Sequence, residues 1–281
     1  MRYYTPLRYP GGKAKLSYYI KAIIKANGIE DGHYIEPYAG GAGVALEILI
    51  QEYVRKIHIN DIDPAVYGFW HSVLFSTEEI CKRINDTNVN METWEKQKNI
   101  LKDSNQVSLV ELGFAAFFLN RTNRSGILNA GVIGGKAQAG EWKMDVRFNK
   151  TNLIKRIEHI AKYESRIKIY NEDGASFVRN FPWNAHQKAL IYLDPPYYHK
   201  GQHLYRNYYE HDDHVHVMES LRNTNIPNWV VTYDNTEQIK SLYSAFRQTE
   251  YNLQYTAQEK KIGGEVMIYS DKIRIPDIQI G

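Results

Sequence analysis

The sequence contains little of what builds disulfide-linked or membrane-embedded proteins. One cysteine, Cys81, among 281 residues excludes an intramolecular disulfide and any metal cluster built from several cysteines. No apolar run approaches the ~20 residues that cross a bilayer, and the N-terminus lacks the apolar core of a secretory signal. We therefore expect a soluble, cytoplasmic protein in a reducing compartment.

Net charge is also small. A formal charge of +3 does not indicate a binder of bulk polyanions, although it is compatible with a local basic face. Repeats and low-complexity tracts are absent from the sequence. Aromatic residues are abundant, with 22 Tyr, 9 Phe and 5 Trp, and such rings both pack in cores and stack on bases. The length suits one large α/β domain or a domain with an inserted subdomain.

The most informative segment is an apolar run that ends in an acid and two prolines. Residues 189–193 are apolar and strand-forming, and Asp194, Pro195, Pro196 and Tyr197 follow. Because neither proline can donate a backbone hydrogen bond, the strand must stop there and leave Asp194 and Tyr197 on a stiff turn. In open α/β sheets, ligands bind outside this end of the strands.

Such a turn suits chemistry on a planar exocyclic amine, whose lone pair is delocalised into its ring. If the Asp194 carboxylate accepted one N–H and the Pro195 carbonyl the other, the nitrogen would move toward tetrahedral geometry and become nucleophilic. Tyr197 would stack on the base, a contact worth ~1–3 kcal/mol in single-strand binders. The alternative reading is a strand end with a surface acid.

A glycine-rich turn between a predicted strand and helix indicates a nucleotide-binding βα unit. The strand is predicted at 34–35, the turn at 36–43 and the helix at 44–53. Asp61 follows a second strand at 56–59, ~20 residues beyond the glycines, where an acid reaches ribose hydroxyls. The alternatives are a plain strand-to-helix connection and a helix N-cap, the latter for Asp63 in particular.

The rest of the chain alternates strands and helices. Further strands are predicted at 167–170, 189–193 and 229–233, and helices at 65–84, 150–163, 214–223 and 236–246. Segments 251–257 and 265–269 flank Gly263 and Gly264 and predict an antiparallel hairpin. The predicted fold is α/β, a doubly wound and mostly parallel sheet with a terminal antiparallel hairpin. Glu36, Asp61, Asp173 and Asp194 are expected at one edge of it.

Residues 85–150 depart from this alternation. Helices are predicted at 94–102 and 107–119, whereas 120–126 and the glycine-rich, basic segment 131–143 read as loops. We interpret 85–150 as a small inserted region for substrate recognition. The catalytic domain is then formed by 1–84 and 151–281.

Together these motifs resemble those of Dam-like, D12-class N6-adenine-specific DNA methyltransferases. The resembling segments are Tyr9-Pro-Gly-Gly-Lys13, Glu36-Pro-Tyr-Ala-Gly-Gly-Ala-Gly43, Asn60-Asp61-Ile62-Asp63, Asn120-Arg-Thr-Asn-Arg-Ser-Gly126, Asp194-Pro-Pro-Tyr197 and the strand at 229–235. Their order, with recognition between the cofactor and catalytic motifs, is similar to that of the family's α group.

The resemblance implies a Rossmann-like class I methyltransferase that uses S-adenosylmethionine to methylate N6 of a flipped-out adenine in a specific double-stranded DNA sequence. The implied catalytic residues are Asp194, Pro195, Pro196 and Tyr197. The implied cofactor contacts are Tyr9, Gly12, Lys13, Glu36, Pro37, Gly40, Gly41, Asp61, Ile62, Asp173 and Asp194. Candidate DNA contacts in the recognition region are Arg121, Asn123, Arg124, Lys136, Lys143 and Arg147. Arg121 and Arg124 have the alternative of surface ion pairs.

Alternatives within the enzyme class are N4 of cytosine in DNA and N6 of adenine in RNA, and Asp rather than Ser before Pro-Pro-Tyr favours adenine. A DNA-binding subunit with a degenerate cofactor fold would need a damaged cofactor motif, and no damage is visible. No metal is expected, because His199, His203, His211, His214 and His216 fit no common zinc spacing. We instead expect a mobile polar loop at 198–213. The sequence leaves open whether a cognate restriction endonuclease is a partner.

Overall fold

The structure is a computed structural model that describes residues 4–8, 13–182, 188–198, 208–224, 227–257 and 259–280. The chain divides into two compact units, which are described separately. Unit 1 comprises residues 1–12 and 63–165, and unit 2 comprises residues 13–62 and 166–281. Among the described residues, no helix is both long and apolar enough to span a membrane.

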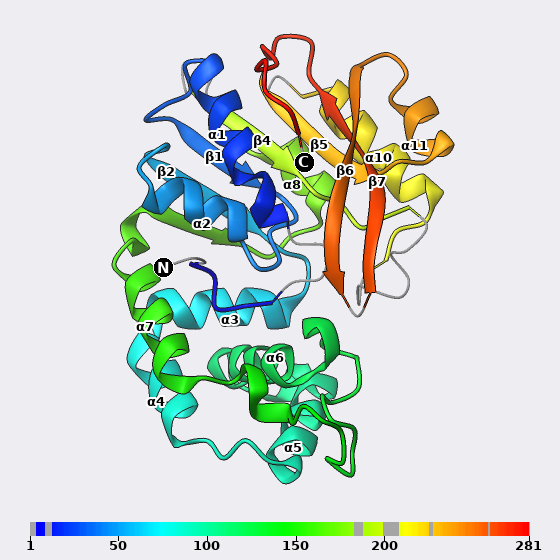
Figure 1. Ribbon diagram of the computed structural model, residues 1–281. Helices are drawn as coiled ribbons and strands as arrows, with labels where there is room; N and C mark the ends of the chain where they lie inside the picture. Colours follow the sequence, from blue (N-terminus) through cyan, green and yellow to red (C-terminus); the bar gives the residue numbers. More distant parts are fainter. Residues whose placement is uncertain are drawn as a thin grey trace. The chain divides into compact units, whose positions relative to one another are not determined.

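Unit 2 is built on a seven-stranded sheet (Figure 1). Its strands are β1 (His33–Glu36), β2 (Lys56–Asn60), β3 (Ile167–Tyr170), β4 (Ala189–Leu193), β5 (Trp229–Asp234), β6 (Arg247–Ala257) and β7 (Glu259–Tyr269). The order across the sheet is β3-β2-β1-β4-β5-β7-β6. β1 to β5 pair in parallel, and β7 runs antiparallel to both β5 and β6. The predicted α/β fold with a terminal antiparallel hairpin is confirmed.

The turn of this hairpin is not where the glycine pair predicts it. Pairing of β6 with β7 continues to Ala257 opposite Glu259, so Gly263 and Gly264 lie inside β7. The prediction was wrong because residues 259–261 are charged and do not read as a strand. Residues 259–264 of β7 pair with β6 but extend beyond the end of β5, which pairs with β7 only from Glu265 onward.

Helices cover both faces of the unit 2 sheet. Short helix η1 (Lys13–Leu16) leads into α1 (Ser17–Ala26), and α2 (Gly43–Ile50), α8 (Gly174–Asn180), α10 (His211–Arg222) and α11 (Glu237–Leu242) complete the set. On one face Ile191, Val231 and Val266 form a core with side chains of α8, α10 and α11. On the other face Tyr34 stacks on Tyr192. The sheet is therefore doubly wound, as predicted.

The histidine-rich segment is partly helical rather than a polar loop. α10 begins at His211, where Glu210 and Asp213 form a reciprocal capping box. His214 is fully buried, and its Nδ1 lies 3.2 Å from the Tyr233 hydroxyl. The loop prediction was therefore wrong for His211 and Asp213, and His199 and His203 lie outside the described residues. Among the residues that are described, no group of three His, Cys, Asp or Glu side chains is arranged to hold a metal.

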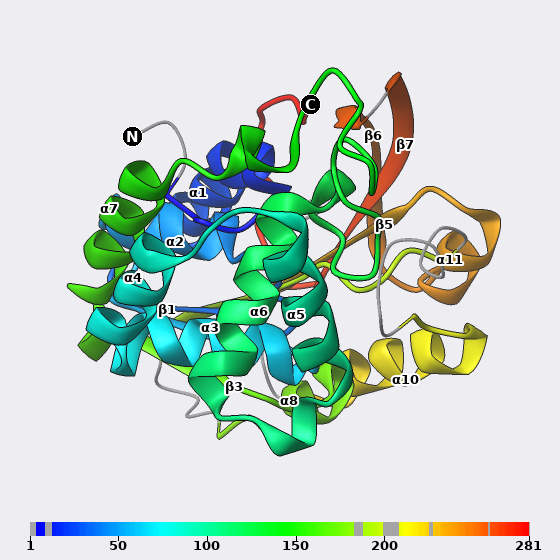
Figure 2. The same cartoon turned by 90° about the horizontal axis from the view of Figure 1, so that it is seen from below.

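Unit 1 is helical (Figure 2). Its helices are α3 (Pro64–Phe75), α4 (Thr77–Asp86), α5 (Met91–Lys102), α6 (Leu109–Thr122) and α7 (Lys150–Ala161), with short helices η2 (Ser104–Gln106), η3 (Arg124–Gly126) and η4 (Met144–Arg147). Short helix η5 (Glu164–Arg166) lies where the chain passes into unit 2. α3 and α6 approach each other closely at Gly68 and Gly113. A Cβ on Gly113 would lie only 2.4 Å from the Gly68 carbonyl oxygen, so this approach requires glycine.

Two helix predictions in unit 1 needed correction. The predicted helix at 65–84 is divided at Ser76, which leaves helical geometry at φ −141° and is followed by α4 with Glu79 in its first turn. The Ser-x-x-Glu spacing of Ser76 and Glu79 is typical of a helix N-terminus and could have predicted this division. α6 continues to Thr122, so Asn120 and Arg121 are helical rather than in a loop. Asp63 caps α3 by accepting from the Ala65 N–H at 2.9 Å, which confirms the N-cap reading.

Candidate active site

The acids at the strand ends gather where the strand order reverses. β1 lies between β2 and β4, so successive strands lead away from it in opposite directions. Glu36 is the last residue of β1, and Asp194 follows the last residue of β4. Asp61 and Asp173 follow the neighbouring parallel strands β2 and β3 at the same edge. Such a switch point is where ligands bind in open α/β sheets.

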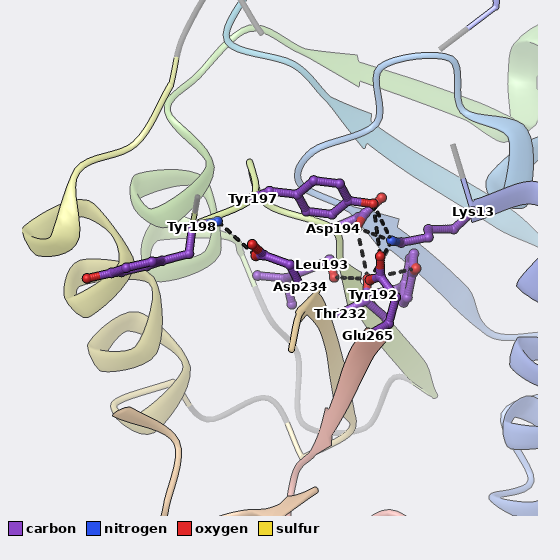
Figure 3. Close-up of polar contacts among 9 residues, drawn as sticks. All are labelled: Lys13, Tyr192, Leu193, Asp194, Tyr197, Tyr198, Thr232, Asp234 and Glu265. Atoms are coloured by element: carbon purple, nitrogen blue, oxygen red, sulfur yellow. Dashed lines mark hydrogen bonds and ion pairs between the residues drawn. The ribbon is translucent and has the colours of Figure 1, made fainter. Parts of the chain in front are cut away.

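Asp194 has two differently placed carboxylate oxygens (Figure 3). Its Oδ1 accepts a hydrogen bond from the Thr232 hydroxyl at 2.9 Å and lies 3.7 Å from Lys13 Nζ. In the described part of the chain, Oδ2 has no hydrogen-bond partner, and 17% of the side chain is exposed. Burial raises the pKa of Asp194 to about 6, opposed by Lys13 and reinforced by Glu265. The site thus offers one oxygen to a ligand while the other is held.

Three side chains close a hydrogen-bonded ring beside Asp194. Lys13 Nζ donates to the Tyr197 hydroxyl at 2.9 Å and to Glu265 Oε2 at 2.8 Å, and the Tyr197 hydroxyl donates to Glu265 Oε1 at 3.2 Å. All three are buried, with Lys13 only 4% and Glu265 only 2% exposed. The ring fixes the angle of the Tyr197 side chain at its hydroxyl end.

The turn after β4 is held at both ends. Pro195 and Pro196 are buried, and the Tyr198 N–H donates to Asp234 Oδ1 at 2.9 Å, which joins the turn to the end of β5. Thr232, which also lies on β5 and donates its hydroxyl proton to Asp194, accepts a 3.0 Å hydrogen bond from the Tyr192 hydroxyl. Thr232 and Glu265 were not predicted from the sequence. Thr232 lies within the 229–235 strand but was not singled out there, and Glu265 lies outside the motifs; both reach the site through strand pairing.

The glycine-rich loop after β1 is organised around two acids. Gly40 and Ala42 both have φ +46°, and the Gly40 N–H donates to Asp61 Oδ2 at 2.9 Å. Glu36 is 4% exposed, and its Oε2 has no partner among the described residues. Burial, followed by the charge of Asp194, raises the pKa of Glu36 well above its usual value. A buried acceptor without a donor indicates a ligand that brings one.

Asn60 ties together three strand ends of this edge. Its amide donates to the Pro37 and Glu172 carbonyls, both at 2.9 Å, and its carbonyl accepts from the Glu172 N–H. Gly41 is buried in the loop, whereas Ile62 is 42% exposed. The loop is therefore positioned before any ligand arrives.

Asp173 is a predicted cofactor residue whose two carboxylate oxygens both contact the protein. Its Oδ1 caps α8 by accepting from the Ser176 N–H at 2.8 Å. Its Oδ2 lies 3.3 Å from the Tyr209 hydroxyl, which is 3.2 Å from that of Tyr38. Tyr9 and Gly12, also predicted to contact the cofactor, lie outside the described residues.

In unit 1 the segment 120–126 has a structural function. Asn120 Oδ1 accepts from the Arg8 N–H at 2.7 Å, and its amide donates to the carbonyls of Arg8 and Gly126. Gly126 has φ +78°, and a Cβ there would lie 2.3 Å from the Arg8 carbonyl oxygen. These contacts position the residue that precedes the Tyr9–Lys13 motif.

The six predicted DNA contacts differ in accessibility. Asn123 is fully buried, where its Oδ1 accepts from Trp94 Nε1 at 2.7 Å, and the Arg121 guanidinium donates to the Arg147 and Pro6 carbonyls. The exposed members are Arg124, Lys136, Lys143 and Arg147. The sequence reading missed Trp142, which is 62% exposed in the same basic segment.

The comparisons with known proteins are consistent with this geometry. The family model for D12 class N6 adenine-specific DNA methyltransferases matches residues 9–257. No curated protein matches the chain in sequence. A candidate RNA methyltransferase from Pyrococcus horikoshii shares 10% identity, over 94% of this chain and 85% of its own, with a TM-score of 0.42. An rRNA methyltransferase from Streptomyces viridochromogenes shares 9%, over 93% and 86%, with a TM-score of 0.38.

Proposed function

Since the chain belongs to the D12 class N6 adenine-specific DNA methyltransferase family, we propose that it methylates N6 of a flipped-out adenine in a specific double-stranded DNA sequence. Membership confirms the resemblance carried by the sequence motifs. The protein is a methyltransferase, and S-adenosylmethionine is its methyl donor. The observation that carries the adenine proposal is Asp194, a partly exposed carboxylate with one oxygen held by Thr232 and the other without a partner among the described residues.

The residues at the sheet edge fit this donor. The unpartnered Oε2 of buried Glu36 suits an ammonium group, which would also relieve the repulsion between Glu36 and Asp194. Asp61, fixed by the Gly40 N–H, is an acceptor for vicinal ribose hydroxyls. When bound, S-adenosylmethionine supplies an electrophilic methyl group on a positively charged sulfur.

The chain's own contribution at the target base is alignment and polarisation. The ionised Asp194 side chain accepts one N–H of the amine and the Pro195 carbonyl accepts the other, so the nitrogen lone pair is directed at the methyl group. Tyr197, fixed at its hydroxyl, offers its ring for stacking. Transfer would form the N–C bond as the methyl–sulfur bond breaks and S-adenosylhomocysteine leaves. The amine proton becomes acidic only then and can pass to the Asp194 carboxylate, so Asp194 need not be a strong base.

Unit 1 carries the proposed DNA surface. Exposed Arg124, Lys136, Lys143 and Arg147 suit phosphate contacts, which position a protein without reading sequence. We do not include Asn123 in this surface, because its side chain is fully buried. The division into a recognition region at 85–150 and a catalytic remainder is kept as a part of this proposal.

The test is methylation by Asp194→Asn. We expect wild-type protein to transfer label from S-adenosylmethionine to duplex DNA, with N6-methyladenine in the digested product by mass spectrometry. The variant should transfer methyl groups at least about 100-fold more slowly, which is the effect typical of removing a positioned catalytic group. Its affinity for S-adenosylmethionine should be unchanged. N4-methylcytosine, product only with RNA, or a variant within a few-fold of wild type would each contradict the proposal.

A further inference from the structure

We propose that Glu265 is a positioning residue that holds the Lys13 ammonium away from Asp194 and so keeps the Asp194 carboxylate available to the substrate amine. The inference rests on the proposed function and concerns a residue outside its motifs. Glu265 enters the site from β7, where it lies opposite Asp234 of β5 and Tyr251 of β6.

The distances show how Lys13 is shared between the two acids (Figure 3). Its Nζ is 2.8 Å from Glu265 Oε2 and 3.7 Å from Asp194 Oδ1. The first distance is a charge-assisted hydrogen bond, whereas the second is an ion pair without close contact. A further bond from Lys13 to the Tyr197 hydroxyl, which itself donates to Glu265, draws the ammonium toward the Glu265 side.

Because these side chains are buried, the position of the Lys13 ammonium depends strongly on which carboxylate is next to it. Because Lys13 and Glu265 are almost fully enclosed, an ammonium that lost Glu265 would lose its closest counter-ion at a buried position, which is costly. Asp194 is the next carboxylate within ion-pair distance. We therefore expect Lys13 to move onto Asp194 when Glu265 is neutralised. A carboxylate hydrogen-bonded to an ammonium has less negative charge to offer an amine N–H, so methyl transfer would slow.

Several charged and titratable groups face Asp194. They are Lys13 from η1, Tyr34 and Glu36 from β1, Tyr192 from β4, Tyr251 from β6 and Glu265 from β7. Of these, Lys13 lowers the pKa of Asp194 and Glu265 raises it. Removing the Glu265 charge takes away the repulsion and brings Lys13 closer. Both effects lower the pKa of Asp194, so the sign of the expected shift is unambiguous.

The experiment compares Glu265→Gln with Glu250→Gln. Glu250 is a matched control on β6, one position from the partner of Glu265, and its carboxylate is exposed and bonded to Asn235 and Lys240. The Asp194 carboxyl is titrated by NMR of 13C-labelled aspartate, assigned with Asp194→Asn. Single-turnover methyl transfer and calorimetric S-adenosylmethionine binding are measured in parallel.

We expect E265Q to lower the pKa of Asp194 and to slow single-turnover transfer by roughly 10–100-fold, the size typical of residues that orient a reactive side chain. Affinity for S-adenosylmethionine should stay within about threefold, a difference of less than ~1 kcal/mol. E250Q should match wild type throughout. A second variant, E265Q combined with Lys13→Gln, should raise the pKa of Asp194 above the wild-type value, because the cation that lowers it is gone.

An unchanged or raised Asp194 pKa in E265Q, or transfer equal to that of E250Q, would overturn the inference. If E265Q folds poorly by circular dichroism, Glu265→Asp keeps the charge on a shorter side chain. It should then retain more transfer activity than the double variant, and the reverse order would also overturn the inference. The titration needs no nucleic acid, so it stays informative if wild-type protein fails to methylate adenine and only the proposed function falls.

Discussion

At the scale of single residues, the site is organised around Asp194, a carboxylate whose ionised form reduces folding stability. Asp194 is buried enough for its pKa to rise to about 6, so ionisation at neutral pH works against the folded state. Thr232, Lys13 and the turn of two prolines hold it in place despite that cost. Such a conflict between stability and placement is typical of a functional position.

The first prediction concerns pH. Because the pKa of Asp194 is raised, the group is protonated below about pH 6, and a protonated carboxyl is a poorer acceptor for an amine N–H. We expect kcat/KM for DNA methylation to fall as pH drops through about 6, approaching tenfold per pH unit below that value. Rates measured from pH 5 to 8 would check this, with S-adenosylmethionine affinity as the control. A flat profile down to pH 5 would contradict the assigned role of Asp194.

At the scale of elements, strand ends were easier to predict than neighbours across the sheet. Asp194 and Asp61 follow apolar strands along the chain, so local pattern sufficed to place them at the sheet edge. Glu265 could not be found this way, because its position depends on β7 being inserted between β5 and β6, and Thr232 lies beside Asp194 only through the parallel pairing of β4 with β5. Chain order does not reveal that insertion. The charged residues at 259–261 also made the first half of β7 unrecognisable as a strand.

A second prediction tests the contact between the glycine-rich loop and α8. A Cβ on Gly174 would lie 2.3 Å from the Tyr38 ring, so Gly174→Ala must displace that side chain. We expect a loss of about 1–3 kcal/mol in unfolding free energy from this overpacking, together with weaker S-adenosylmethionine binding. Denaturant melts and calorimetry would measure both. Gly264→Ala is the matched control, because its nearest neighbour at 3.5 Å is an ordinary contact, and equal losses in the two variants would contradict the argument.

At the scale of the whole molecule, chemistry and DNA contact are assigned to different units. Unit 2 contains the acids of the sheet edge, whereas unit 1 carries the basic loops around 131–147. The net charge of +3 would not have indicated a DNA-binding protein. What indicates one is where the exposed cations lie, together with exposed Trp142 among them. The proposal of a recognition region rests on segment order, whereas the buried position of Asn123 and the partly buried position of Arg121 depend on packing that sequence patterns do not report.

The last prediction is that the salt dependence of DNA binding will depend on the exposed Lys136 and Lys143 but not on Arg121, whose guanidinium is held by backbone carbonyls. Each phosphate contact releases counterions, so losing one reduces the slope of log K against log salt by about 0.9. We expect Lys136→Gln and Lys143→Gln each to flatten this slope, measured by fluorescence anisotropy on duplex DNA between low and moderate salt. Lys102→Gln, which changes another exposed cation of unit 1 outside the predicted set, should leave it unchanged.

Arg121→Gln provides the opposite outcome within the same experiment. Its guanidinium already donates to the Arg147 and Pro6 carbonyls, and burial lowers its pKa. The variant should therefore lose folding stability, by about 1–3 kcal/mol for carbonyls left without their donor, before it changes the salt slope. If Arg121→Gln flattened the slope at unchanged stability while Lys136→Gln and Lys143→Gln did not, the DNA surface would have to be moved from the loops to α6.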